Sequence, residues 1–318
     1  MKHRRDFYLK FFLCLLFLVL AGTVPAFAYE TVPVENGGFI TGRVVLNGPV
    51  PEPRVFPMVL YPFGDFCKKI SDAKGHVVLK EFNVDETGGL QDAVIAIQEI
   101  AKGKGFRADE NRLITINCMF HPANVPEDEQ FEVREGNLVH IHPLVSVMRN
   151  RHVLAVSNRD PVIHDAQFYQ KETGRRITRF SIPISTRTQK EWVYLEPGNK
   201  IAQIVCGMHE YMQTWAWVVD NPYFDKTIRD GSYAIDRLPP GTYKIIAWHP
   251  HLKPIEKMVT VPPGGHVQLD FEFEAKEVVR PIYETQKQFR ISPERDPNVN
   301  LFGCEGPYCV KREHDHEE

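Results

Sequence analysis

Alternation between apolar and polar side chains at every second residue is the feature that most constrains this chain. The segment HVQLDFEFEA shows it clearly, since its apolar residues Val267, Leu269, Phe271 and Phe273 alternate with Gln268, Asp270, Glu272 and Glu274. A period of two is that of a half-buried strand. Similar short, β-branched runs broken by Gly, Pro, Asn and Asp begin at FITGRVVLNG and recur along the chain, without a long helical periodicity. The pattern predicts an all-β protein.

The N-terminal residues are of a different kind. Lys2, Arg4 and Arg5 precede an apolar run, and AFA then provides a small-residue cleavage site after Ala28. This order is that of a secretory signal peptide, and the apolar run is shorter than the ~20 residues of a membrane span. We therefore predict a signal peptide at 1–28 and a mature chain in the periplasm or outside the cell, with no membrane span.

The net charge of the mature chain indicates which partners it does not bind, and its length indicates how many domains it has. Residues 1–28 hold four basic side chains and one acidic one, so the mature chain carries a net charge of −6. A mildly acidic chain has no electrostatic reason to bind nucleic acid or an anionic membrane. The 290 mature residues suit two or three domains. We divide them into 29–105, 106–221 and 222–276, followed by a tail at 277–318.

Five cysteines remain in the mature chain, and an odd number leaves at least one thiol outside intramolecular disulfides. Cys304 and Cys309 enclose the turn-forming EGPY and could close a small loop, and Cys67 could bridge to Cys118. Cys206 would then be the free thiol, although the count alone does not establish this pairing.

Cys206 lies in VCGMHEYM, where His209 and Met212 follow it at spacings of three. Thiolate, imidazole and thioether together suit copper better than any other common metal. A fourth ligand is available upstream in SNRDPVIHDAQF, where His164 follows a Pro-containing turn. The alternative is that Cys206 is a buried structural thiol, because free cysteine is among the most buried residue types.

Other histidines have plainer interpretations. His140 and His142 lie on one side of a predicted strand, and we interpret them as surface residues rather than a weak chelating pair. His249 and His251, in WHPH, are predicted to be structural. No motif of a hydrolase, a phosphate-binding loop or a carboxylate pair is present, so we predict a protein that is not an enzyme.

NRDPVIHDAQF, followed by VCGMHEYMQTWAWVVD, resembles the ligand motifs of cupredoxins, and the short Cys-x-x-His-x-x-Met loop is similar to that of amicyanin-like members. The segments GGFITGRVVLNGPVP and RDGSYAIDRLPPGTYKIIAWH resemble carboxypeptidase regulatory-like, transthyretin-type sandwiches. The resemblance implies an all-β fold in which a cupredoxin-like Greek-key sandwich (106–221) is flanked by small β-sandwich domains (29–105 and 222–276).

The resemblance also implies a site. It makes His164, Cys206, His209 and Met212 the copper ligands. Family members often have Asn after the first histidine, where this chain has Asp165. An ionised carboxylate there would favour Cu(II) over Cu(I) and so lower the reduction potential.

The implied function is one-electron transfer with another exported redox protein, such as a cytochrome or a dehydrogenase. Two alternatives remain open. In the first, copper is cargo for storage or delivery. In the second, the chain is a structural or adhesion β-module whose copper site is vestigial.

Overall fold

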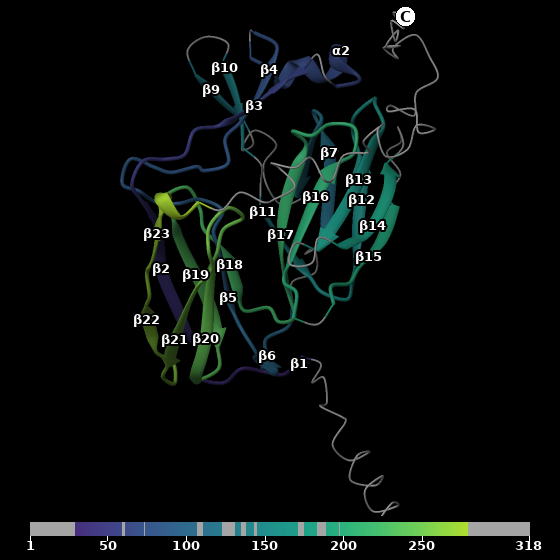
Figure 1. The fold of residues 1–318 in the computed structure, drawn as a ribbon. Coiled ribbons are helices and arrows are strands. Elements are labelled where there is room, and N and C mark those ends of the chain that lie inside the picture. The colour runs from purple at the N-terminus through teal and green to yellow at the C-terminus, as the bar shows by residue number, and fades with distance from the viewer. Residues whose placement is uncertain are drawn as a thin grey trace, which may run out of the picture.

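The computed structural model describes residues 29–58, 61–72, 74–106, 111–122, 131–134, 138–142, 145–170, 175–182, 189–196 and 198–278. Nearly all elements within these residues are strands, so the predicted all-β class is confirmed (Figure 1). The predicted signal peptide and almost all of the predicted tail lie outside the described residues. Within them, none of the helices has the length and hydropathy of a membrane span.

Strands from both ends of the described chain form one sandwich, which we call the terminal sandwich. One sheet has the order β18 (Phe224–Lys226), β5 (Val94–Ile97), β20 (Gly241–Trp248) and β21 (Ile255–Val261). The other has the order β19 (Ser232–Leu238), β2 (Gly38–Asn47) and β22 (His266–Gln268), and β23 (Phe271–Glu274) also pairs with β2. Buried apolar side chains of both sheets form its core, among them Ile40, Ile95, Ile245 and Phe271.

This pairing differs from the predicted organisation. Residues 29–105 and 222–276 were expected to form separate sandwiches, but β2 pairs with β19, β22 and β23 of the second segment, and β5 lies between β18 and β20. Buried residues of both segments, such as Ile40 and Ile245, belong to the same core cluster. The two segments therefore share one core.

The second sandwich, which we call the central sandwich, holds the predicted ligand residues. Its larger sheet has the order β11 (Val145–Arg149), β17 (Gln213–Val219), β16 (Ile201–Cys206), β13 (His164–Gln170) and β14 (Arg175–Ile182). The facing sheet has the order β15 (Gln189–Val193), β12 (His152–Asn158), β7 (Arg112–Ile116) and β8 (Met119–Pro122). Leu113, Val156, Phe168, Ile204 and Val218 belong to the buried core that these sheets contribute to.

A third group of elements covers one end of the central sandwich (Figure 1). Its sheet has the order β3 (Arg54–Pro57), β4 (His76–Leu79), β10 (Leu138–Ile141) and β9 (Phe131–Arg134), and between β3 and β4 lie the short helices α2 (Gly64–Cys67) and η2 (Lys68–Ile70). We call residues 54–79 the cap. Phe56, Cys67 and Leu79 of the cap share the apolar core of the central sandwich. This part of the predicted N-terminal segment therefore belongs structurally to the region of the site.

The two sandwiches pack side by side through an aromatic interface. Trp215 and Trp217 of β17 share one buried cluster with Trp248 of β20, and the ring centroids of Trp217 and Trp248 are 5.2 Å apart.

His142 is also buried, with Nε2 2.6 Å from the Asp92 carboxylate, so its interpretation as a surface residue was wrong. One short pair, β1 (Glu30–Thr31) with β6 (Lys102–Gly103), and the 3₁₀ turn η4 (Ala275–Glu277) after β23 complete the described elements.

Candidate metal centre

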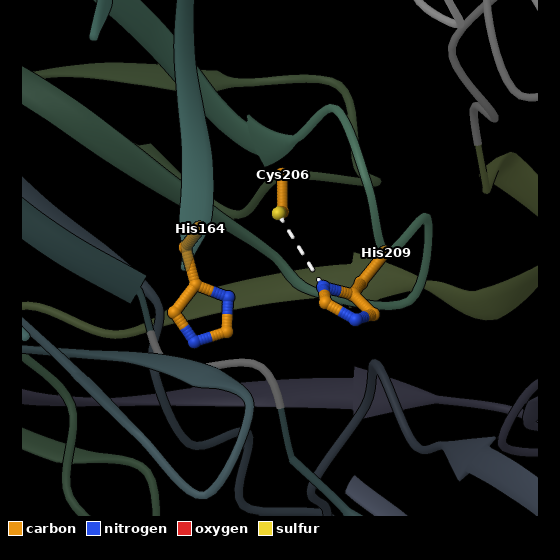
Figure 2. A group of neighbouring side chains, drawn as sticks. All are labelled: His164, Cys206 and His209. Atoms are coloured by element: carbon orange, nitrogen blue, oxygen red, sulfur yellow. Dashed lines mark hydrogen bonds between the residues drawn. The ribbon is translucent and has the colours of Figure 1, made fainter. Parts of the chain in front are cut away.

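Two neighbouring strands and the loop after one of them bring three predicted ligands together. His164 begins β13, Cys206 ends β16, and these strands are antiparallel neighbours with Ala166 opposite Cys206. His209 lies in the loop from β16 to β17. One ligand atom from each of the three side chains lies within 4.8 Å of the other two, and all three residues are buried (Figure 2).

The loop that carries His209 is closed by its own backbone. The Cys206 N–H donates to the Met212 carbonyl at 2.9 Å, and the Met212 N–H donates to the His209 carbonyl at 3.0 Å. These bonds keep the loop short, as the spacing of three predicts. Met212 is fully buried in the same apolar cluster as Cys206, and its role as a ligand stays a prediction.

The two imidazoles are each anchored through their outer nitrogen. His209 Nε2 lies 3.0 Å from the Pro62 carbonyl, which can only accept, so Nε2 carries the proton and the Nδ1 lone pair faces the Cys206 sulfur at 3.6 Å. His164 Nε2 lies 2.9 Å from the Asp160 carboxylate. Among the described residues, the buried His164 Nδ1 has no hydrogen-bond partner of ordinary geometry. Figure 2 shows both rings grouped around the Cys206 sulfur.

The electrostatics of the site favour a thiolate. Burial opposes ionisation of Cys206, but the neighbouring imidazoles of His164 and His209 outweigh it and lower the pKa of the thiol to about 5. Burial likewise opposes protonation of His164, but Asp160 and Cys206 outweigh it and raise the pKa of the imidazole to about 9. Both shifts favour an imidazolium beside a thiolate, an arrangement in which a bound cation would take the place of the proton.

A thiolate, an imidazole and a carboxylate can also form a nucleophilic site. Cys206 and His164 are 4% and 0% exposed, however, and both lie within the core of the central sandwich. Such burial suits a small ion held inside the protein better than a substrate that must reach the sulfur. The donor set, the two buried imidazoles and the unpartnered Nδ1 fit a metal ion.

A disulfide borders this site. Cys67 and Cys118 are bonded, as the sequence predicted, and Cys206 is the free cysteine of the described residues. The Cys67 sulfur lies 3.9 Å from His209 Nε2. Cys118 also groups with Asp160 and His164, but its sulfur is bonded to Cys67 and is not a thiolate ligand in this state. Cys304 and Cys309 lie outside the described residues.

Asp165 lies beside the ligand loop without belonging to the ligand group. Its carbonyl accepts from the Gly207 N–H at 2.8 Å, and its carboxylate accepts from Gln167 Nε2 at 2.7 Å. The predicted effect of its charge on the reduction potential stays a prediction.

The carboxylate that contacts a ligand directly is Asp160, which the sequence analysis missed. An acidic residue four positions before His164, in the turn that leads to it, was the available signal.

Comparison with known proteins does not assign this chain to a family. No family model matches the chain, and no curated protein matches it. Among solved structures, a purple cupredoxin from Nitrosopumilus maritimus is 15% identical over 34% of this chain and 99% of its own, with a TM-score of 0.21. The copper-containing nitrite reductase of Thermus scotoductus SA-01 is 14% identical over 39% of this chain and 25% of its own, with a TM-score of 0.22. We draw no argument from likenesses at these TM-scores.

Proposed function

We propose that this chain is an exported copper protein of the cupredoxin type and that it transfers single electrons. The observation that carries the proposal is the buried set of His164, Cys206 and His209, whose ligand atoms lie within 4.8 Å of one another. Two imidazoles and one thiolate, with the thioether of Met212 that we assign as a weak fourth ligand, would form a ligand set suited to both Cu(I) and Cu(II). Copper would supply the one-electron couple.

The residues around the site would keep the copper ligands in fixed positions, as rapid electron transfer requires. The loop from Cys206 to Met212 is fixed by its backbone bonds, and Asp160 and Pro62 hold the outer nitrogens of the imidazoles. Ligands held in place before metal binding rearrange little between oxidation states, which favours rapid electron transfer. We expect the partner to be another exported redox protein, such as a cytochrome or a dehydrogenase, and we expect no catalysis by the chain itself.

Storage or delivery of copper is the second candidate, and one observation favours it. His209 is 0% exposed, and its outer nitrogen is bonded to the cap through Pro62. An ion bound below the cap would be enclosed, which suits retention of cargo. The third possibility, a structural module, requires that the site bind no copper.

A visible spectrum of the mature protein with one equivalent of Cu(II) tests the proposal. We expect an intense thiolate-to-Cu(II) charge-transfer band, which Cys206→Ser abolishes while circular dichroism shows an unchanged β-rich fold. Met208→Leu is the matched control, because Met208 lies in the same loop and packs against the same core, and it should keep the band. Tight Cu(I) binding without the band would favour storage, and no copper binding would leave the structural alternative.

A further inference from the structure

The outer supports of the two imidazoles belong to different parts of the fold. Asp160 holds His164 from the turn between β12 and β13, and Pro62 holds His209 from the cap. Groups that hold the outer nitrogen of a ligating histidine fix its ring and commonly affect metal affinity strongly. The groups that hold Asp160 and Pro62 in place therefore also determine how firmly the two imidazole rings are oriented.

Asp160 is held by the hairpin turn between β7 and β8. Its Oδ1 accepts from the Asn117 N–H at 2.6 Å, and its Oδ2, which also contacts His164, accepts from the Cys118 N–H at 2.8 Å. Asn117 and Cys118 both have positive φ, at 54° and 57°, which is the geometry of a two-residue turn with both amides available on one side. The Asp160 carboxylate is buried and thus fixed between the turn and His164.

The cap is attached to the same turn by a covalent bond. Cys118 is joined to Cys67, whose own N–H donates to the Phe63 carbonyl at 3.0 Å, one residue after Pro62. The Cys67 sulfur also contacts His209 Nε2 at 3.9 Å. A single disulfide therefore connects the support of His164 with the support of His209.

We propose that Asp160 is a positioning residue for His164, and that the Cys67–Cys118 disulfide fixes both imidazoles through the turn on one side and the cap on the other. The cap strands β3 and β4 and the strands β7 and β8 belong to different sheets, and the disulfide limits the motion of the cap relative to the β7–β8 turn. Its loss lets the turn and the cap move apart, and both ring N–H groups lose their fixed acceptors. The copper consequences of this proposal rest on the proposed function, but the positioning itself does not.

Proton exchange at the imidazole rings of the metal-free protein tests the positioning. In wild type, we expect the Nε2 protons of His164 and His209 to exchange slowly in NMR spectra, because each is buried and hydrogen-bonded. Cys67→Ser/Cys118→Ser should raise both exchange rates at least about tenfold. Asp160→Asn should raise the rate at His164 alone. Cys304→Ser/Cys309→Ser, as the matched control, should change neither.

Unchanged ring exchange in the disulfide variant, or equal changes at both histidines in Asp160→Asn, would overturn the proposal. Asp160→Asn keeps the shape of the side chain, so it decides the role of Asp160 even if the disulfide variant fails to fold. In that case Cys67→Ala/Cys118→Ala, which removes the bond without placing a β-branched side chain at the positive φ of residue 118, decides the role of the disulfide.

Copper affinity adds a second measurement. Competition with a Cu(II) chelator should give about 10–100-fold weaker binding for Asp160→Asn, with a changed reduction potential. Since both changes act on His164, loss of the disulfide should weaken binding by a smaller factor in the Asp160→Asn background than in wild type. Strictly multiplicative factors would contradict the coupling. If wild type binds no copper, the proposed function fails, and the ring exchange still decides this inference.

Discussion

At the scale of single residues, Gly207 lies so close to two neighbouring side chains that the position leaves no room for a Cβ atom. A Cβ at this position would lie 2.3 Å from Asp165 Oδ2 and 2.4 Å from Gln167 Nε2, two buried atoms that are hydrogen-bonded to each other. Gly207→Ala must separate this pair or displace the loop beside Cys206. We expect it to cost about 1–3 kcal/mol in the free energy of unfolding and to weaken metal binding.

Chemical denaturation and metal titration measure both effects of Gly207→Ala. Gly64→Ala is the matched control, because its Cβ would meet nothing within 4 Å. Equal stability and equal affinity of the two variants would show that the loop accommodates the added methyl group.

His249 predicts a dependence of stability on pH. It is buried and stacked on Phe82 at 4.8 Å, and burial, together with repulsion from His251, lowers the pKa of the imidazole to about 3. The unfolded chain, with an ordinary histidine pKa of about 6.5, binds the proton more readily between these values. Stability therefore falls as pH decreases from about 6.5 toward 3, and by pH 5 the loss from His249 is about 2 kcal/mol.

Unfolding free energies at pH 7 and pH 5 test this expectation. The difference between the two pH values should shrink by about 2 kcal/mol in His249→Gln, which cannot titrate. His266→Gln, at an exposed histidine of β22, should keep the wild-type difference. A His249→Gln difference equal to that of wild type would mean that other groups account for the acid sensitivity.

At the scale of elements, the turn between β7 and β8 requires residues that tolerate positive φ. Asn117 is well suited to φ of 54°, whereas a β-branched side chain is strained there. We expect Asn117→Val to destabilise the protein by about 1–3 kcal/mol and Asn117→Gly to stay near wild type. Thermal unfolding at neutral pH measures both, and similar losses for Val and Gly would point to the Asn side chain rather than the backbone.

At the scale of the whole molecule, strand pairing makes the terminal sandwich depend on both ends of the chain. The fragment 29–221 lacks β18–β23, so β5 loses its neighbours β18 and β20, and its buried residues Val94–Ile97 become exposed. We expect fast amide hydrogen exchange in β5 and binding of a hydrophobic dye. A fragment ending at residue 278 retains these strands and should show neither change. Protected β5 amides in the shorter fragment would mean that the N-terminal segment folds independently.

The sequence determined the features that depend on short stretches of chain. Period-two alternation reports that one face of a strand is buried, which is enough for the all-β class. The spacing of Cys206, His209 and Met212 defines a short loop that its backbone bonds close, and the odd cysteine count predicted at least one thiol outside intramolecular disulfides, which among the described residues is Cys206. Each of these follows from residues that are near one another or from a simple count.

Only the tertiary structure decided which strands are neighbours and what surrounds the site. Alternation shows that β2 has a buried face but not that β19, β22 and β23, about two hundred residues away, cover it. The support of His164 by Asp160 depends equally on a turn around Asn117 that lies more than forty residues earlier in the chain. The physical reason is that pairing and burial are non-local: a strand's pattern fixes how much surface it must bury, and the packing of the whole chain selects the partner that buries it.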